Sequence, residues 1–290
     1  MPVTARPATP TDVTDIVDLQ ARWDTHWFGA PEHDEAEVTG SLRRAEPLAE
    51  RSRLLLDGDR LLAAAWWWRS DDATILIDPD TESGRAARDL VPWLARGGAD
   101  HVEALARDNE LLGVLAELGW VHVRSQFELL GSPDGLPAPE WPDGVSVSVL
   151  GDDTAEVHHL IYEEAGWADV PGHTTRDLDE WRSLFVTGED PAQQVLARAD
   201  GHLVGAALGK IFSDGTGWVA QLAVRRDQQG RGLGSALLAE AFARRVAAGA
   251  TRLGLGVSAA NASALRLYER IGLTIDREWM VHRPSAAAAG

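Results

Sequence analysis

Residues 229–234 read Gln-Gly-Arg-Gly-Leu-Gly, and they decide the fold. They lie four residues after a predicted strand that ends in Gln-Leu-Ala-Val at 221–224, and they open a long amphipathic segment, 232–248, that is typical of a helix. The first turn of a helix leaves backbone N–H groups unpaired and carries a partial positive charge, so an anion can bind there. At Gly232 and Gly234 no Cβ stands between these donors and the oxygens of an anion. The sequence therefore predicts a strand, loop and helix that hold a pyrophosphate.

The charge of the chain limits the classes of partner. Its 45 acidic and 27 basic residues give a formal net charge of −18, which disfavours nucleic acid and anionic lipid because both require clustered Lys and Arg. The same field favours a cationic or amine-bearing substrate. Near the glycine loop, Arg225, Arg226 and Arg231 supply the local positive charge that an anionic ligand needs.

Length and composition indicate a soluble protein of two domains. A chain of 290 residues, 44% hydrophobic and 25% charged, can bury two cores of ordinary size. No apolar run approaches the roughly 18 residues of a membrane span, and residues 1–6 do not resemble a signal peptide. We therefore expect a cytoplasmic protein without a membrane partner. Because the chain has no cysteine, it has no disulfide, thiolate nucleophile or cysteine metal site.

A segment rich in proline and glycine, 131–144, predicts a linker between two domains, 1–130 and 145–290. On each side we expect a strand, two helices, a hairpin, a strand, a helix, a strand, a helix and a last strand. In the second half the strands are expected at 145–150, 194–198, 203–212, 218–224, 253–257 and 274–282, and the helices at 153–165, 175–185, 232–248 and 262–271. Asp153 and Glu156 resemble a capping box, and Thr175 can cap the next helix. The chain therefore has the pattern of a duplicated α/β domain.

A second motif follows the glycine loop. Residues 261–272 read Asn-Ala-Ser-Ala-Leu-Arg-Leu-Tyr-Glu-Arg-Ile-Gly, which predicts a helix that follows a strand and ends in glycine. Together with residues 229–234 this motif resembles the GCN5-related N-acetyltransferases, the GNAT superfamily, whose acetyl-CoA loop has the pattern Gln/Arg-x-x-Gly-x-Gly/Ala. The resemblance covers residues 145–283. It implies two tandem GNAT-like domains, each an α/β fold with a central mixed, mostly antiparallel sheet flanked by helices, and acetyl-CoA as the acyl donor.

The resemblance also implies roles for individual residues. Backbone groups of the strand 222–224 would contact the pantetheine arm and the thioester carbonyl. Tyr268 lies where the family often places a general acid for the departing CoA thiolate. The expected cofactor-binding residues are Leu222, Ala223, Val224, Gln229, Gly230, Arg231, Gly232, Leu233, Gly234, Ser235, Asn261, Ser263 and Arg266.

The acceptor side is harder to read. An amine that attacks a thioester must be neutral, yet Gln221 stands where some relatives carry a carboxylate, and an amide cannot take a proton. By the family fold, the helix and loop at 163–173 border the acceptor pocket, and Glu164 is the expected base. Glu32 in the first half could also shape this pocket. The expected substrate-binding residues are Asp24, His26, Glu163, Asp169, His173 and Gln221. No spacing of His, Asp and Glu predicts a metal site.

Some of these residues also have a structural interpretation. Asn261 is a good N-cap for the helix that follows it, and Tyr268 could be a core residue of that helix. The three tryptophans at 66–68 occupy a predicted strand, where side chains alternate between faces, so we expect at least one of them in the core.

The first half has lost the residues of the loop. Setting Ile77 against Val224 places Arg85 and Ala87 at the positions of the two loop glycines, and setting Gly119 against Gly272 places Leu115 at the position of Tyr268. We therefore expect the first domain to keep the fold without a working cofactor site.

The expected function is transfer of an acetyl group from acetyl-CoA to a primary amine of an unidentified small molecule, by direct attack in a ternary complex. Tandem members of the family that acetylate a cysteinyl amine on a sugar-inositol share the layout, and a peptide N-terminus is another possible acceptor. A non-catalytic acyl-CoA sensor is the alternative of another class, favoured by Gln221 and opposed by Tyr268. The sequence leaves the choice between monomer and homodimer open.

Overall fold

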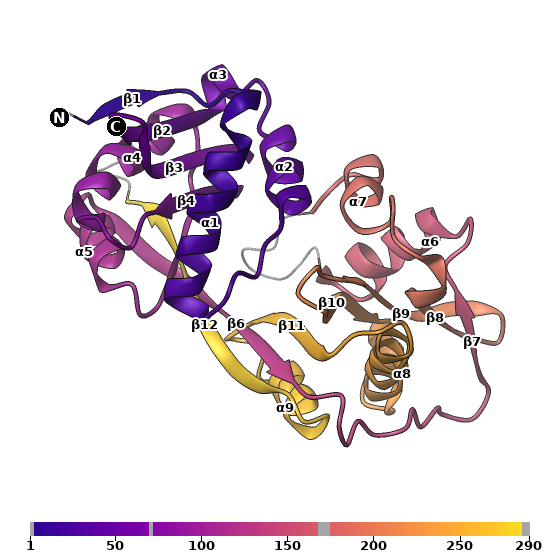
Figure 1. The fold of residues 1–290 in the computed structure, drawn as a ribbon. Coiled ribbons are helices and arrows are strands. Elements are labelled where there is room, and N and C mark those ends of the chain that lie inside the picture. Colours follow the sequence, from indigo (N-terminus) through magenta and orange to yellow (C-terminus); the bar gives the residue numbers. More distant parts are fainter. Residues whose placement is uncertain (1–2, 70–71, 168–174, 286–290) are drawn as a thin grey trace. The chain divides into compact units, whose positions relative to one another are not determined.

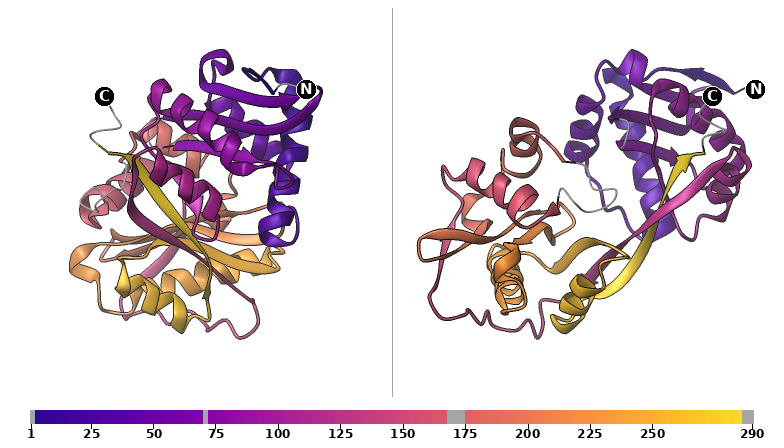
Figure 2. Two further views of the ribbon diagram at one scale, coloured as in Figure 1. Left: turned by 90° about the vertical axis from the view of Figure 1, so that its left-hand side faces the viewer. Right: turned by 180° about the vertical axis from the view of Figure 1, so that it is seen from behind.

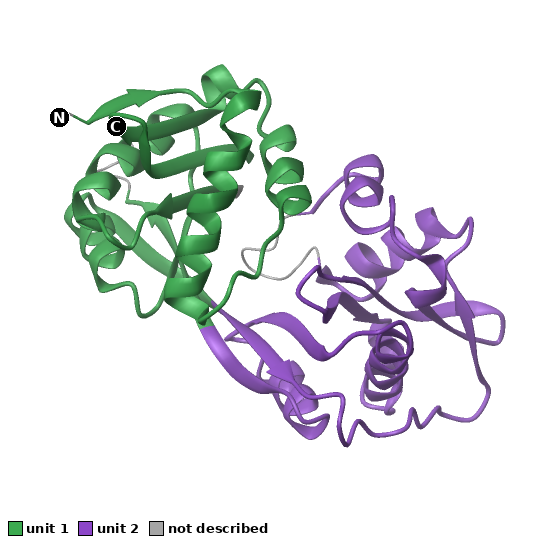
Figure 3. Ribbon diagram, viewed as in Figure 1, with its two compact units in different colours: residues 1–125, 278–290 green, residues 126–277 purple. Residues whose placement is uncertain are grey.

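The computed structural model describes residues 3–69, 72–167 and 175–285, and the chain forms two compact units (Figure 1; Figure 3). The first unit comprises residues 1–125 and 278–290, and the second comprises residues 126–277. Strands β6 (Trp120–Gly131) and β12 (Thr274–Pro284) each continue from one unit into the other. The division between the units therefore falls inside two strands.

The sequence places the boundary elsewhere. Segment 131–144 begins at the last residue of β6 and leads to β7 (Val145–Val149), so both of its ends lie in the second unit. Residues 126–130 lie in the second unit and residues 278–285 in the first, although each belongs to the other half of the sequence. The physical reason is that alternation along a strand reports which face is buried but not which strand is its neighbour.

Both halves show the predicted order of elements. The remaining elements of the first unit are β1 (Thr4–Arg6), η1 (Pro10–Asp12), α1 (Val13–Phe28), α2 (Glu35–Arg44), α3 (Leu48–Arg51), β2 (Ser52–Asp57), β3 (Arg60–Arg69), β4 (Asp72–Ile77), α4 (Ser83–Gly97), β5 (Val102–Leu105) and α5 (Asn109–Glu117). Those of the second unit are α6 (Thr154–His159), the π-helical turn η2 (Leu160–Glu164), α7 (Leu178–Phe185), η4 (Pro191–Gln193), β8 (Val195–Ala199), β9 (His202–Ile211), β10 (Thr216–Val224), η5 (Arg226–Gln228), α8 (Leu233–Ala247), β11 (Arg252–Ser258) and α9 (Ala262–Arg270).

The first unit contains a four-stranded sheet, β1–β4, with helices on both faces (Figure 1; Figure 2). Strands β1 to β4 are antiparallel in sequence order, and β5 pairs antiparallel with β12. On one face Ile16 of α1 packs with Leu54 and Trp66, and on the other Leu90 of α4 packs with Leu55. Because Leu54 and Leu55 are neighbours in β2, their side chains enter opposite cores. The expectation that one of the tryptophans at 66–68 is buried is confirmed by Trp66.

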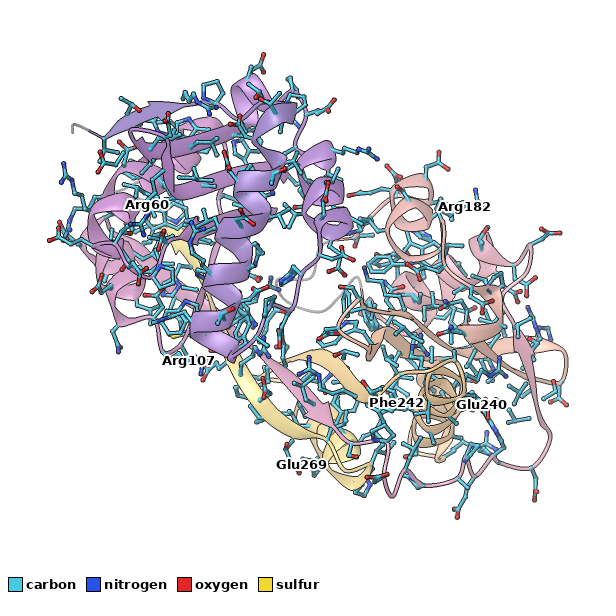
Figure 4. The ribbon with its side chains drawn as sticks, in the orientation of Figure 1. Arg60, Arg107, Arg182, Glu240, Phe242 and Glu269 are labelled. Atoms are coloured by element: carbon cyan, nitrogen blue, oxygen red, sulfur yellow. The ribbon has the colours of Figure 1, made fainter. Side chains whose placement is uncertain are left out.

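The second unit has the same layers. Its strands follow the order β6-β11-β10-β9-β8-β7, in which β10 and β11 are parallel and the other recorded pairs are antiparallel. Phe242 of α8, labelled in Figure 4, is fully buried against one face together with Val219. On the other face Ile161 and Trp181 pack with Leu208. The mixed, mostly antiparallel sheet flanked by helices is therefore as predicted.

Two predicted helix caps are wrong. Asp153 and Glu156 form no capping box, because Arg198 of β8 binds their carboxylates at 2.9 and 2.7 Å. Thr175 does not cap α7, because the helix begins later and Asp177 is its N-cap. In the first case a long-range ion pair replaces a local hydrogen bond, and in the second a nearer carboxylate takes the role.

Candidate active site

The loop between β10 and α8 holds a row of backbone donors. Gly230 and Gly232 adopt left-handed φ angles of 76° and 88°, and Gly232 is the N-cap of α8. Within the described parts of the chain, the backbone N–H groups of residues 230–235 have no recorded acceptor. The Gln229 side chain donates to the carbonyl of Val224 at 3.0 Å and so ties the loop to the end of β10. This row of unpaired donors at a helix N-terminus is suited to the oxygens of a phosphate group.

Gly232 and Gly234, on either side of Leu233, differ in how far their backbone and surroundings require glycine. At Gly232 the backbone is left-handed, which a side chain disfavours. At Gly234 a Cβ would lie 3.6 Å from Leu267 Cδ2 and 3.8 Å from Val224 Cγ2, which are ordinary contacts. The side of Gly234 that lacks a Cβ therefore faces α9 and β10, and it does not clear a path to the anion as the sequence analysis expects.

The three arginines near the loop are used differently. Arg225 forms a bidentate pair with Asp227, at 2.6 and 3.0 Å, so much of its charge is neutralised. Arg226 lies against Gly166, whose φ is +82°, so closely that a Cβ there would collide with the guanidinium group. Arg231 is exposed and donates to Gln228 Oε1 at 2.6 Å. Of the three, Arg231 is the one whose recorded partner is an uncharged side chain.

Strand β10 is irregular just before the loop. Its pairing with β9 shifts register between Val219 and Gln221, so Ala220 is bulged. The parallel ladder with β11 extends only from Thr216 to Val219, whereas pairing with β9 continues to Val224. Past the bulge, the edge of β10 that is turned away from β9 lies outside this ladder. Leu222, Ala223 and Val224 are thus placed where the predicted contacts to a thioester would be possible, and those contacts stay a prediction.

Helix α9 contributes its first turn and Tyr268. The Asn261 side chain accepts from the N–H of Ala264 at 3.1 Å, so its interpretation as an N-cap is confirmed, and Ser263 Oγ donates to it at 3.1 Å. Arg266 is exposed, and no hydrogen bond or ion pair of its side chain is recorded among the described residues. All three predicted residues of this helix therefore lie at its first turns, with their cofactor contacts untested.

Tyr268 is 7% exposed and packs in the core formed with α8. Burial raises the pKa of its phenol to about 12. No hydrogen bond of the hydroxyl is recorded within the described ranges. Tyr268 is thus a core residue, and its hydroxyl contributes no recorded hydrogen bond to the fold.

The candidate base lies on the π-helical turn. The wider turn is closed by the N–H of Ala165, which donates to the carbonyl of Leu160 at 2.7 Å. Glu163 is exposed, and Glu164 Oε1 lies 3.9 Å from His159 Nε2. The pKa of Arg225 is raised chiefly by its hydrogen bond to Asp227, and the charge of Glu164 adds to this. Asp169 and His173, the other residues expected here, lie outside the described residues.

Gln221 is buried, although it is expected to bind substrate. It is 3% exposed, and its Oε1 accepts from Trp181 Nε1 at 2.8 Å. Its side chain is also hydrogen-bonded to the phenol of Tyr162. The sequence analysis assigns no role to Trp181 or to Tyr162. The signal that could have identified both is that a buried indole N–H or phenol requires a polar partner.

In the first unit, Asp24 serves the fold. Its carboxylate is fully buried and accepts from Gln20 Nε2 at 2.7 Å and from the backbone N–H groups of Glu32 and His33 at 2.9 and 3.1 Å. His26 is exposed and lines a cavity of about 540 Å³ within this unit. Asp24 therefore organises the turn after α1, whereas His26 remains accessible.

The first unit differs from the second at the equivalent loop. Residues 78–82 number five, whereas residues 225–232 number eight, so counting onward from Ile77 and Val224 is three residues out at the helix start. Aligning the helix starts places Glu82 at Gly232 and Gly84 at Gly234, in place of the predicted Arg85 and Ala87. This first-unit loop is therefore shorter, and acidic at its N-cap.

A carboxylate occupies the start of α4. Glu110 accepts from Ser83 Oγ and, at 3.2 Å, from the N–H of Gly84. Glu110 is the second residue of α5, as Ser263 is of α9, so an acid replaces a small neutral residue. The first unit thus places its own anion where the second unit exposes donors.

Among the described helices, none has the length and apolar character that crossing a bilayer requires. Within the same ranges, no group of three or more His, Asp or Glu side chains is arranged to hold a metal ion.

Comparison with known proteins agrees with this geometry. The Acetyltransferase (GNAT) family matches residues 155–273. A mycothiol acetyltransferase of Clavibacter michiganensis subsp. michiganensis is 34% identical over 251 residues, covering 77% of this chain and 81% of the relative. One from Thermobispora bispora is 30% identical over 254 residues, covering 81% and 83%.

Solved structures agree over almost the whole chain. A GCN5-related N-acetyltransferase from Sphaerobacter thermophilus matches with a TM-score of 0.80 and 26% identity, covering 97% of this chain and 95% of that one. A tandem GNAT protein from the clavulanic acid biosynthesis pathway matches with a TM-score of 0.69 and 18% identity, covering 97% and 98%, and supports the fold alone. The mycothiol acetyltransferases are at least 30% identical to the chain over most of its length, and the glycine loop and the bulged strand agree with this match. The chain therefore belongs to the GNAT family of acetyltransferases.

Proposed function

We propose that the second unit transfers an acetyl group from acetyl-CoA to a primary amine of a small molecule, by direct attack within a ternary complex. The observation that carries the proposal is the row of backbone N–H groups at residues 230–235 that have no recorded acceptor among the described residues. Six adjacent donors around a helix N-terminus fit the pyrophosphate of a nucleotide cofactor, because aligned N–H groups and the helix dipole both favour negative charge.

The residues of this chain divide the work of the reaction. The edge of β10 at residues 222–224 aims backbone groups at the thioester, where an N–H stabilises the charge that develops on the carbonyl oxygen. The amine nitrogen forms the new C–N bond, the C–S bond breaks, and the sulfur leaves as a thiolate. Tyr268 hydrogen-bonds the departing sulfur. Glu164 takes the proton of the amine, directly or through water.

The acceptor is a small-molecule amine. Because the relatives over most of the chain are mycothiol acetyltransferases, the amine that those proteins acetylate is the first candidate, and the chain resembles mycothiol synthase in its tandem layout. A peptide N-terminus is the second candidate. The net charge of −18 supports a cationic acceptor and argues against nucleic acid. We place the reaction in the cytoplasm, in a monomer or a homodimer.

We also propose that the first unit holds no acetyl-CoA. Glu110 already occupies the donors at the start of α4, and Leu115 takes the place of Tyr268. On this proposal, residues 145–290 contain the catalytic domain and residues 1–130 a degenerate copy.

A two-step experiment tests the proposal. Acetyl-CoA at about 100 times its Kd should add about 2.7 kcal/mol to the free energy of unfolding, measured by thermal or denaturant unfolding. A panel of amines, including the mycothiol precursor and short peptides, is then assayed for release of free CoA. Stabilisation without turnover of any amine would favour the alternative, a non-catalytic acyl-CoA sensor, and the absence of stabilisation would refute the donor site.

A further inference from the structure

Gln221 is a buried polar residue directly after the bulge in β10, and the proposed reaction gives it no task. Its side chain is 3% exposed, and an amide cannot act as the base. Buried amides cost free energy unless their donor and acceptor groups are satisfied, so the partners of Gln221 indicate what it holds in place.

Two aromatic side chains satisfy this amide. Trp181 of α7 is fully buried, and its Nε1 donates to Gln221 Oε1 at 2.8 Å. Tyr162 of η2 is 2% exposed, and its phenol is hydrogen-bonded to the Gln221 side chain. Side chains from two different elements therefore engage the amide.

The two aromatic residues are themselves held. The ring of His158 lies 4.8 Å from that of Tyr162 and 5.6 Å from that of Trp181, and its Nε2 donates to the carbonyl of Arg176 at 2.8 Å. The backbone of Arg176 also bonds the Tyr162 phenol.

Helix α7 has a second attachment. Arg182, labelled in Figure 4, donates to Thr154 of α6 at 2.9 and 2.6 Å. The network therefore joins α6, η2, α7 and β10 through directional bonds, which fix one arrangement more strictly than apolar packing does.

We propose that Gln221 is a positioning residue: held between Trp181 and Tyr162, it fixes the bulge at Ala220 and so sets the direction of the N–H groups at residues 222–224. This inference rests on the proposed function, in which the N–H that faces the edge of β10 turned away from β9 meets the thioester carbonyl. A shift of one residue in the register at the bulge would turn each following N–H to the opposite edge of the strand, because alternate backbone groups of a strand point to opposite edges.

The test removes one hydrogen bond and leaves a smaller aromatic ring in place of the indole. Trp181→Phe should lower kcat roughly tenfold or more while the KM for acetyl-CoA changes by less than about twofold, because the loop at 229–235 is untouched. The control is Trp66→Phe in the first unit, which removes a buried indole bond of similar geometry, 2.9 Å to Ser41 Oγ. It should lower the melting temperature similarly and leave kcat unchanged. Full kcat in Trp181→Phe overturns the proposal.

Gln221→Glu separates positioning from base catalysis. A buried carboxylate without a cation disturbs the network, so kcat should fall between about pH 6 and 9. A kcat that instead rises above wild type, with a new ionisation in the pH profile, would identify position 221 as a base site and overturn the positioning role.

Amide hydrogen exchange keeps this test independent of turnover. In Trp181→Phe the N–H groups of residues 221–224 should exchange roughly tenfold faster than in the wild type, whereas Trp66→Phe should leave them unchanged. Unchanged exchange in Trp181→Phe overturns the inference even if acetyl transfer occurs. Faster exchange in a protein that acetylates no amine would uphold the network and reject the proposed function.

Discussion

Removing the hydroxyl of Tyr268 should slow catalysis by a predictable amount. Burial raises the pKa of this phenol to about 12, whereas a thiol has a reference pKa of about 8.5. Full transfer of the proton from the phenol to the thiolate would thus be uphill by about 3.5 units, or about 4.8 kcal/mol. We therefore expect Tyr268 to donate a hydrogen bond to the leaving sulfur while remaining protonated, and the proton that finally neutralises the thiolate to come from solvent.

The magnitude follows from this role. A hydrogen bond to a charged group contributes about 1.5–3 kcal/mol, so Tyr268→Phe should lower kcat roughly 10- to 150-fold. Binding of acetyl-CoA should change little, because the donors at residues 230–235 are backbone groups. Stability should also change little, because no hydrogen bond of the hydroxyl is recorded among the described residues.

The assay is steady-state release of CoA between about pH 6.5 and 10, with melting curves for both proteins. Because the folded pKa of Tyr268 is raised, the phenol remains protonated over this range, and any loss of stability linked to it begins only as pH rises above about 10. Full activity of Tyr268→Phe would refute the role in catalysis. A wild-type alkaline limb near pH 9–10 that disappears in the variant would show that the phenol ionises and would refute the hydrogen-bond argument.

Three further predictions test other parts of the structure. Gly232→Ala should lower the free energy of unfolding by about 1–2 kcal/mol and weaken acetyl-CoA binding, because the φ of Gly232 is 88°. Gly234→Ala should do neither, because a Cβ there meets only ordinary contacts. Thermal unfolding with and without acetyl-CoA compares the two variants. Calorimetric titration should give one CoA per chain, and two equivalents would contradict the role given to Glu110. The Arg6 guanidinium, and next Thr9, hold the pKa of Asp12 at about 2, so the stability that the Asp12 carboxylate contributes should be complete above about pH 4 and lost towards pH 2. Urea unfolding should show wild type to be more stable than Asp12→Asn by about 1–2 kcal/mol at pH 7, a reduced value because Arg6 is partly exposed, and this difference should vanish towards pH 2.

The parts of the fold that depend on neighbours in sequence could be predicted. The glycine loop at 229–234, the helix that follows and the N-cap at Asn261 are local features, and each needs a particular residue type at a particular place. The same is true of the alternation that sends Leu54 and Leu55 into opposite cores.

The parts that depend on distant partners could not. The pattern of β12 predicts a strand, but not that residues 279–282 pair with β5 in the first unit. Asp153 has the sequence environment of a cap, yet Arg198 binds it instead. In both cases the competing partner lies far away in sequence, and no local pattern reports it.

The loop of the first unit shows why counting onward from the end of a strand fails. Its three missing residues shift the alignment, so the sequence points to Arg85 and Ala87, whereas the structure places Glu82 and Gly84 there. The conclusion that this loop is ill-suited to a phosphate remains a prediction, but its physical basis changes from lost glycines to added negative charge. Glu110, which the sequence analysis does not mention, is the residue that makes the charge argument specific.

The contrast between donor and acceptor sides has a common cause. The donor groups are backbone N–H groups, and a backbone conformation is encoded by the residues that adopt it. The acceptor side depends on side chains brought together by the fold, and there Gln221 illustrates the difficulty. Read along the chain, it stands at the place of a catalytic carboxylate. In space its amide is enclosed by Trp181 and Tyr162, which lie 40 and 59 positions earlier in the sequence. A base for the amine must therefore come from a group that remains accessible, and of the described candidates Glu163 and Glu164 meet that condition.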